Sequence, residues 1–284
     1  MSSTLRYAFY GHHKCASTWV HSVIDQVVAD TGHRVAYLYD SKNFDGDLRG
    51  HIDRERVEFL SYVNADIEHT KDLPAHKAFH MIRDPRDLIV SSYFSHKGSH
   101  PTHAWPELIP YREKLKTVPK DEGLMLELEF SSPFLNQIST WDYEQEHVLE
   151  FRQEDFTPDP YRAFLRAFEF IGLLDGEHYS KASWFPYLLQ SATNIANRLS
   201  KGAFPLRFPM HGIPGERLLG IVYDNRYEKF AGGRTSGQEN TKSHYRKGVG
   251  GDWVNHFTPE LKGVFKERYG DLVSRLGYAE DECW

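Results

Sequence analysis

Apolar residues along the chain fall into two alternating patterns, short continuous runs and longer stretches with helical spacing. The runs at 5–10 and 77–82 are typical of strands buried on both faces. Behind the first run, apolar residues recur at helical spacing over 19–28, and Thr31-Gly32 provides a helix end. The second run is followed by a helix that Pro85 opens. This alternation predicts a parallel sheet with helices on both faces.

The same signals divide the rest of the chain. Residues 40–53 are predicted as a loop, and 97–122, rich in proline and histidine, as an insertion. Further strands are expected at 34–39, 65–68 and 147–152, and further helices at 54–63, 131–146, 159–171, 184–198 and 259–276. In a parallel sheet of this kind, ligands bind outside the carboxyl ends of the strands.

Composition narrows the class of protein. The chain has 284 residues and a formal net charge of −6, which argues against a general nucleic-acid binder. Its two cysteines, Cys15 and Cys283, do not suggest a disulfide framework. A basic leader with an apolar core and an apolar run of about 18 residues are both missing. We therefore expect a cytoplasmic protein without a transmembrane segment.

The segment between the first strand and the first helix, 11–18, has the features of an anion site. Gly11 is expected to allow a sharp turn, and Ser17 and Thr18 suit the first turn of a helix. Such a unit directs backbone N–H groups and a helix N-terminus at one spot. The usual nucleotide loop has Lys immediately before its Ser or Thr, whereas Lys14 lies three positions before Ser17. A tight turn with a solvated lysine is the alternative for this segment alone.

Two further motifs accompany this loop. The three segments are K-C-A-S-T-W at 14–19, R-D-P-R-D-L-I-V-S at 83–91 and R-K-G-V-G-G-D-W-V-N-H-F-T at 246–258. In order and spacing they resemble the motifs of the sulfotransferases that use 3′-phosphoadenosine 5′-phosphosulfate (PAPS). Those enzymes have P-K-S-G-T-T-W in the loop, R-N-P-x-D with a serine eight residues after the arginine, and R-K-G-x-x-G-D-W-x-N-x-F-T near the C-terminus.

The resemblance implies a fold, an activity and a donor. The fold is an α/β fold with a P-loop-type central parallel sheet flanked by helices, in a single sulfotransferase domain over 1–284. The activity is in-line transfer of a sulfuryl group from PAPS to an acceptor hydroxyl, or less readily an amine, with release of 3′-phosphoadenosine 5′-phosphate (PAP). We treat this transfer by analogy with phosphoryl transfer. The protein supplies the positive charge, so no metal is required.

The resemblance also assigns roles to residues. Lys14 stabilises the charge that develops on the leaving phosphate, and the loop around it binds the 5′-phosphate and borders the adenine. The loop residues concerned are Lys14, Cys15, Ala16, Ser17, Thr18 and Trp19. Those assigned to the 3′-phosphate are Arg83, Ser91, Arg246, Lys247 and Gly248, where the arginine forks can bind phosphate by two bonds.

The chain departs from the family pattern in places. Cys15-Ala16 replaces Ser-Gly, and His13 replaces the proline before the lysine. Gln153 stands where many members have a tyrosine near the adenine, which puts that contact in doubt. His12 and His13 could add charge at the loop, but we expect them at the surface.

The candidate base lies between the first two motifs, where Glu68-His69-Thr70 precedes a turn. We expect His69 to take the proton of the acceptor hydroxyl, with Glu68 as its main rival. His80 lies inside the strand predicted at 77–82 and is interpreted as a packed or hydrogen-bonded core residue.

Two other functions remain open from the sequence, a P-loop kinase or NTPase and a catalytically silent PAP-binding or scaffold protein. His96, His100 and His103 have spacings that could hold a metal, but Gly98 and Pro101 interrupt one helical face, so we expect surface histidines and no metal. The acceptor is expected to be a small molecule or lipid with a hydroxyl, bound between 97–133 and 202–237.

Overall fold

A five-stranded parallel sheet forms the centre of the protein, with the strand order β2-β3-β1-β4-β5. The computed structural model describes residues 4–103, 105–175, 181–204, 206–281 and 284, with the side chains of 181–183 left out, so Cys283 lies outside the described residues. The strands of the sheet are β1 (Tyr7–Gly11), β2 (Val35–Leu38), β3 (Phe59–Val63), β4 (Lys77–Ile82) and β5 (Val148–Arg152). The predicted parallel sheet flanked by helices is therefore confirmed.

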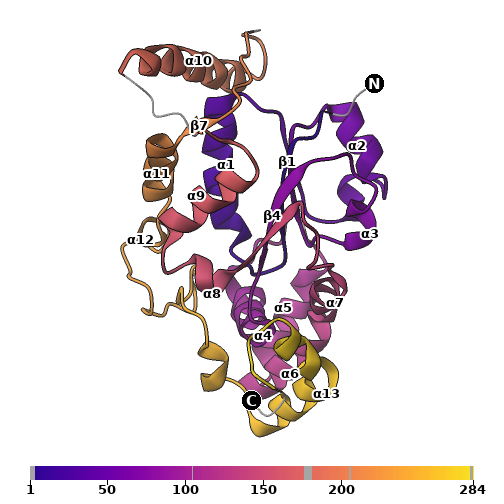
Figure 1. Cartoon of the computed structure of the whole chain (residues 1–284). Coiled ribbons are helices and arrows are strands. Elements are labelled where there is room, and N and C mark those ends of the chain that lie inside the picture. The colour runs from indigo at the N-terminus through magenta and orange to yellow at the C-terminus, as the bar shows by residue number, and fades with distance from the viewer. Residues whose placement is uncertain (1–3, 104, 176–180, 205, 282–283) are drawn as a thin grey trace.

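Helices cover both faces of the sheet (Figure 1). On one face, rings such as Phe9 and Phe79 pack against the apolar side chains of three helices. These are α1 (Ser17–Thr31), α9 (Pro160–Phe170) and α11 (Gly215–Asp224). On the other face, the apolar side chains of β1 and β3 pack under Phe44, which follows the short 3-10 helix η1 (Ser41–Asn43), and under α2 (Leu48–Glu55) and α3 (Ile67–Thr70).

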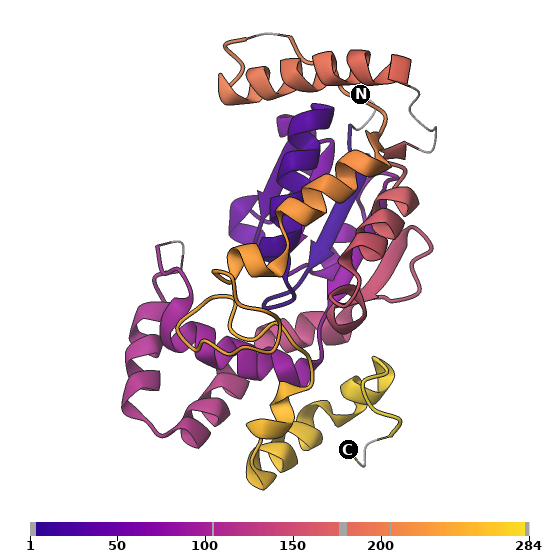
Figure 2. The ribbon, with the colours of Figure 1, turned by 90° about the vertical axis from the view of Figure 1, so that its left-hand side faces the viewer.

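A third group of helices packs together beyond the carboxyl ends of the strands, around a separate apolar cluster (Figures 1 and 2). Its members are α4 (Pro85–Phe94), the π-helical segment η2 (Ser95–Ser99), α5 (Leu108–Thr117), α6 (Lys120–Phe130), α7 (Ser132–Thr140) and α13 (Pro259–Arg275). The remaining elements are α8 (Gln153–Phe156), β6 (Leu174–Asp175), α10 (Lys181–Leu199), β7 (Ile213–Pro214), α12 (Tyr227–Phe230) and the 3-10 helix η3 (Asp252–Asn255).

Two predicted elements between β2 and β4 are wrong. The helix expected at 54–63 is the end of α2 followed by β3, and the strand expected at 65–68 is a loop that leads into the first two residues of α3. Every residue of β3 is buried, and the strand pairs with both β1 and β2. A short apolar run has the same appearance in a buried strand and in a buried helix, and here pairing with distant strands decided the outcome. Residues 40–53, predicted as a loop, contain η1 and most of α2.

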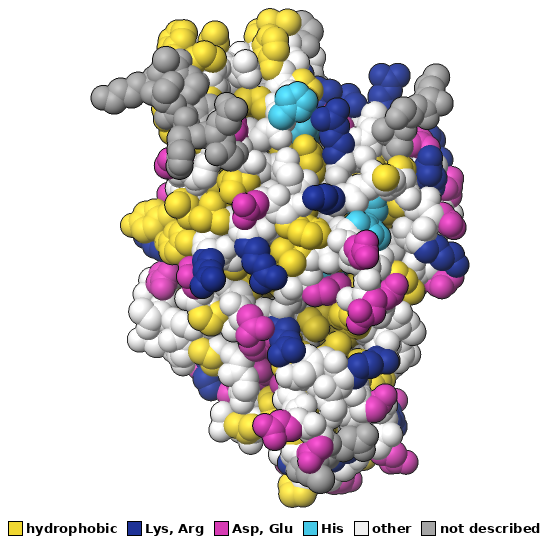
Figure 3. All heavy atoms as spheres, viewed as in Figure 1, with side chains coloured by type: hydrophobic (Ala, Val, Ile, Leu, Met, Phe, Trp, Pro, Cys, Tyr) yellow, Lys and Arg dark blue, Asp and Glu magenta, His cyan; other side chains and the backbone are white. Residues whose placement is uncertain are grey.

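The surface carries a mixture of side chains. Figure 3 shows basic and acidic groups interspersed on one face, with an apolar area over α10 at the top. Exposed apolar residues of α10 include Phe185, Leu188 and Leu189. Within the described part of the chain, none of the helices combines the length and apolar character needed to cross a membrane.

Candidate functional site

The loop between β1 and α1 makes its turn at two residues that are not glycine. Lys14 and Ala16 have φ of 61° and 58°, in the left-handed region. Gly11, predicted to be the turn residue, remains within β1, where a Cβ would lie 2.9 Å from Cζ of Phe9. Gly11 therefore provides space rather than a turn. The cost of the left-handed backbone falls on Ala16, where the resembling family has glycine.

The loop leaves donors free at the start of α1. Ala16 is the N-cap residue and provides no side-chain cap. Within the described chain, the backbone N–H groups of Ser17 and Thr18 have no acceptor. The Ser17 hydroxyl instead donates to the carbonyl of His12 at 3.2 Å. An uncapped helix N-terminus with free N–H groups suits a phosphate oxygen.

Lys14 extends from this loop toward η2. Its Nζ donates to Oγ of Ser95 at 3.0 Å, and the residue is half-buried. Burial, and after it the positive charge of Arg83, lowers the pKa of Lys14 to about 7. Cys15, next in the chain, is fully buried, and burial raises the pKa of its thiol to about 12. The thiol is therefore a packed group and not a reactive one.

Arg83 connects the loop to the C-terminal motif. It follows β4, the neighbour of β1, and its guanidinium donates to the carbonyls of Lys14 at 3.4 Å and Val249 at 3.5 Å. Both bonds are long, and Nε of Arg83 is buried with no partner among the described residues. A buried guanidinium that is only partly satisfied fits a ligand with phosphate oxygens.

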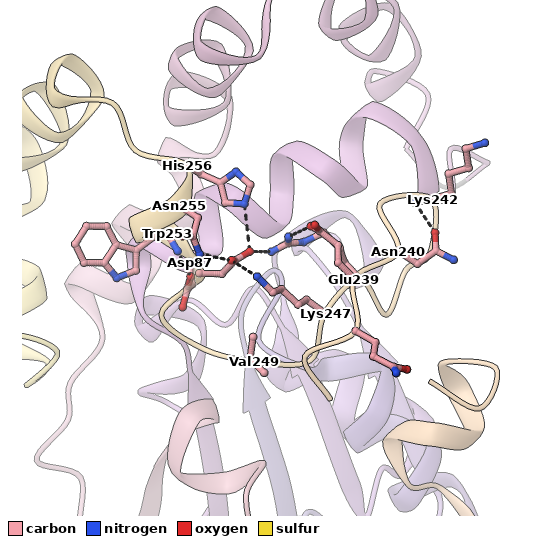
Figure 4. A network of polar contacts seen from close by, with 12 residues as sticks. Asp87, Glu239, Asn240, Lys242, Lys247, Val249, Trp253, Asn255 and His256 are labelled. Carbon is pink, nitrogen blue, oxygen red and sulfur yellow. Dashed lines mark hydrogen bonds and ion pairs between the residues drawn. The ribbon is translucent and has the colours of Figure 1, made fainter. Parts of the chain in front are cut away.

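The C-terminal motif forms a network around one buried carboxylate, that of Asp252 (Figure 4). The carboxylate accepts from Arg246 Nη2 at 2.6 Å and from Lys247 Nζ at 2.5 Å. The Arg246 guanidinium also pairs with Glu239 and lies 4.7 Å from the centre of the Phe94 ring. Carboxylates therefore hold the side chains of Arg246 and Lys247, the two cations of this motif assigned to the 3′-phosphate. A bound phosphate would interact with these cations alongside the carboxylates.

A second carboxylate ties this motif to α4. Asp87 accepts from the backbone N–H of Gly251 at 2.5 Å and of Trp253 at 2.8 Å. Asp87 lies in the first turn of α4, four residues after Arg83, so the start of this helix holds the C-terminal motif close to Arg83. Sequence reasoning missed this role, although Asp87 is the fixed acidic residue of the R-D-P-R-D segment.

The remaining residues assigned to the nucleotide, Ser91, Gly248 and Trp19, differ in burial and in their neighbours. Ser91 is half-buried on α4. Gly248 has φ of 70°, and a Cβ there would lie 2.7 Å from Cε2 of Tyr227. Trp19 is buried, with its ring edge-on to Phe156 and Phe164.

The candidate base His69 lies on α3. Its Nδ1 is 2.9 Å from the hydroxyl of Tyr62, and its ring packs edge-on against Phe44 at 5.2 Å. Glu68 is exposed and pairs with Lys71. The contacts found in the described chain join neither residue to Lys14 or Arg83.

The expectation of surface histidines is wrong for three of them. His12, His13 and His96 are buried: Nε2 of His12 faces Nε2 of His80, Nε2 of His13 faces Nε2 of His96, and Nδ1 of His96 faces the Glu127 carboxylate. His80 is a hydrogen-bonded core residue, and His103 is exposed, both as expected. Helical spacing could not reveal these pairs, because their partners are far away in the sequence.

Comparison with known proteins supports the fold alone. No protein-family model matches the sequence, and no curated protein matches it significantly. The crystal structure of mouse sulfotransferase SULT7A1 complexed with PAP aligns over 98% of this chain and 87% of that chain, with a TM-score of 0.50 and 16% identity. Retinol dehydratase in complex with androsterone and inactive cofactor PAP has a TM-score of 0.41 and 15% identity, over 96% of this chain and 81% of that one. Retinol dehydratase in a complex with retinol and PAP has a TM-score of 0.41 and 14% identity, over 96% and 82%. The strand order and the SULT7A1 match together show that this chain has the fold of the PAPS-dependent sulfotransferases.

Proposed function

We propose that the protein is a PAPS-dependent sulfotransferase that transfers a sulfuryl group to an acceptor hydroxyl and releases PAP. The placement of Arg83 carries this proposal. Its guanidinium contacts the loop through Lys14 and the C-terminal motif through Val249, and it keeps a buried N–H unused. A nucleotide with phosphates on both its 5′ and 3′ positions needs two anion-binding segments side by side, and a simple nucleoside triphosphate does not.

The loop residues take the 5′-phosphate in this proposal. Free N–H groups of Ser17 and Thr18 meet its oxygens, and the ammonium of Lys14 stabilises the charge that grows as the bridging bond breaks. Bound PAPS supplies the sulfuryl group, and the protein supplies orientation and positive charge. The proposal requires no metal ion.

The 3′-phosphate is assigned to Arg83, Ser91, Arg246, Lys247 and the N–H of Gly248. Asp252 holds Arg246 and Lys247 in position before the ligand arrives, so the phosphate needs to order fewer side chains. The acceptor is a small molecule or lipid bound between 97–133 and 202–237. His69, with Glu68 as its rival, remains the base that the sequence predicts, and a cytoplasmic location also remains a prediction.

The nucleotide preference tests the proposal. At saturating and matched concentrations, PAP should raise the melting temperature much more than 5′-AMP, because a ligand at 100 times its dissociation constant adds about 2.7 kcal/mol to the unfolding free energy. Replacing Arg83 by Ala should remove most of the difference between the two nucleotides. Equal shifts from both nucleotides, or a shift with Mg-ATP only, would favour a P-loop kinase instead.

A further inference from the structure

A chain of three buried ionisable groups begins at His13, immediately before Lys14. Nε2 of His13 lies 2.9 Å from Nε2 of His96, and Nδ1 of His96 lies 3.0 Å from Oε1 of Glu127. His96 and Glu127 are completely buried, and His13 is 8% exposed. The Glu127 carboxylate also accepts from the hydroxyls of Tyr111 at 3.0 Å and Ser131 at 2.5 Å. Three donors therefore hold this carboxylate in one orientation.

The carboxylate sets the tautomer of each ring. Because Glu127 accepts, His96 carries its proton on Nδ1 and presents a lone pair on Nε2. His13 must then donate from Nε2, which leaves the lone pair of His13 on Nδ1. That atom has no partner among the described residues, and it is not one of the buried polar atoms closed off from solvent.

This lone pair lies beside the group assigned to the leaving phosphate. His13 and Lys14 are consecutive, and so are Ser95 and His96, so two contacts join the same pair of segments: Lys14 to Ser95 at 3.0 Å and His13 to His96 at 2.9 Å. The ring of Phe134 stacks on His13 with the ring centres 4.4 Å apart. A group bound next to Lys14 would therefore lie close to the ring of His13.

We propose that Nδ1 of His13 is the general base for the acceptor hydroxyl, with His96 and Glu127 as positioning residues. The inference rests on the proposed sulfuryl transfer. The acceptor oxygen bonds to sulfur while the bond from sulfur to the bridging phosphate oxygen breaks, and the electron pair of that bond stays on PAP. The hydroxyl proton moves to Nδ1 of His13. The resulting imidazolium donates from Nε2 to His96, which donates to the Glu127 carboxylate, and the proton passes to water after product release.

The charge around His13 suits a base that is neutral before the reaction. Burial is the main cause that lowers the pKa of His13 below its ordinary range, and positive neighbours lower it further. The ionisable groups that face the ring, directly or through His96, are Lys14, His96, His100, His244 and Glu127. The activity should therefore fall with decreasing pH only below the ordinary histidine value of about 6.5.

The same rings could be read as ligands of a metal ion, because His13, His96 and His100 place one nitrogen each within 4.8 Å of one another. Two observations favour the hydrogen-bonded array. The facing nitrogens of His13 and His96 are already at hydrogen-bond distance, and the neighbouring Lys14 and Arg112 add positive charge that opposes a divalent cation. Dialysis against EDTA should therefore leave the activity unchanged, and a loss restored by Zn²⁺ would overturn the proposal.

The chain contains a second array with the same order of groups, which serves as a control, although its two rings meet edge-on at 75° whereas those of His13 and His96 stack at 26°. Nε2 of His12 lies 2.8 Å from Nε2 of His80, and Nδ1 of His80 lies 2.6 Å from Oε2 of Glu150. In this array, however, Nδ1 of His12 is buried without a partner, so no substrate can reach it. The array of His12 therefore has the same sequence of hydrogen-bonded groups, but its terminal nitrogen is closed to a substrate hydroxyl.

The experiment compares two acceptors in the wild type and in His13→Ala at pH 8, with PAPS saturating. An alcohol must lose its proton during the attack, whereas a nitrophenol is already ionised at this pH. We expect His13→Ala to lower kcat by about 10²-fold or more for the alcohol and by much less for the nitrophenol, with added imidazole restoring part of the alcohol rate. Equal losses for both acceptors, without rescue by imidazole, would show a structural role and overturn the assignment.

Glu127→Gln and Glu150→Gln extend the test to the positioning residues. Glu127→Gln should lower kcat for the alcohol by tenfold or more and move the acid limb of its pH profile to lower pH, since the imidazolium of His13 loses its support. Glu150→Gln should change neither. If wild type transfers sulfate and these two variants behave alike, or if His69→Gln alone abolishes turnover, the array is not the base. If wild type neither binds PAP nor uses PAPS, the proposed function itself is wrong.

Discussion

Binding of PAP should draw a proton onto Lys14. Burial and the charge of Arg83 lower the pKa of Lys14 to about 7 in the free protein, whereas phosphate next to the ammonium favours its charged form and raises the pKa. At pH 8 a group with this pKa is about 90% neutral, so binding should take up about 0.9 proton. Above pH 7, each additional pH unit should raise the dissociation constant of PAP about tenfold, which is ~1.4 kcal/mol of binding free energy. The reason is that binding takes up a proton, and the proton concentration falls tenfold with each pH unit.

Calorimetry in several buffers measures this proton directly. At pH 8 the phosphates of PAP are fully ionised, so the dependence of the apparent binding enthalpy on the ionisation enthalpy of the buffer counts protons taken up by the protein. We expect about 0.9 for wild type and close to zero for Lys14→Met. Ser91→Ala, which keeps the ammonium, should weaken binding equally at all pH values and leave the uptake unchanged. Uptake near zero in wild type, or uptake that persists in Lys14→Met, would refute the reasoning.

Two substitutions test how the loop and the C-terminal motif are held. Ala16→Gly should raise the free energy of unfolding, measured with urea, by about 0.5–1 kcal/mol. The left-handed backbone costs alanine about 1–2 kcal/mol, which exceeds the conformational entropy that glycine loses on folding. A lower free energy of unfolding in Ala16→Gly would show that Ala16 is not strained. Asp87→Ala should lower that free energy by about 1–3 kcal/mol and weaken PAP binding, because the N–H groups of Gly251 and Trp253 lose their acceptor; unchanged PAP affinity would show that Asp87 does not position the site.

The sequence predicted those parts of the fold that depend on local patterns. The strand at 77–82 and the helix ended by Gly32 match the structure, because continuous apolar runs and a left-handed glycine are local signals. The error at 54–63 arose because β3 is defined by pairing with β1 and β2, which no local pattern reports. Likewise, the motifs placed Arg83 near the loop, since both follow neighbouring strands.

The buried histidine arrays could not be predicted in the same way. His13 and His96 are 83 positions apart, and Glu127 is 31 positions beyond His96. A glutamate between two leucines of α6 and two adjacent histidines in a tight loop were visible signals, but nothing in their spacing relates one to the other. The ion pairs of Asp252 were also missed, because the motif includes this aspartate but the resemblance assigned roles only to its cations and to Gly248.

Transfer of labelled sulfate tests the central claim most directly. The protein is incubated with PAPS labelled with ³⁵S and with a panel of alcohols and phenols, and the labelled organic sulfate and PAP are both quantified. The account predicts equal amounts of sulfated acceptor and PAP, with kcat about 10²-fold lower or more in Lys14→Ala and PAP binding weakened less. Tight binding of PAP without any labelled product across the panel would indicate a silent binding protein. Normal turnover by Lys14→Ala would contradict the role given to the loop.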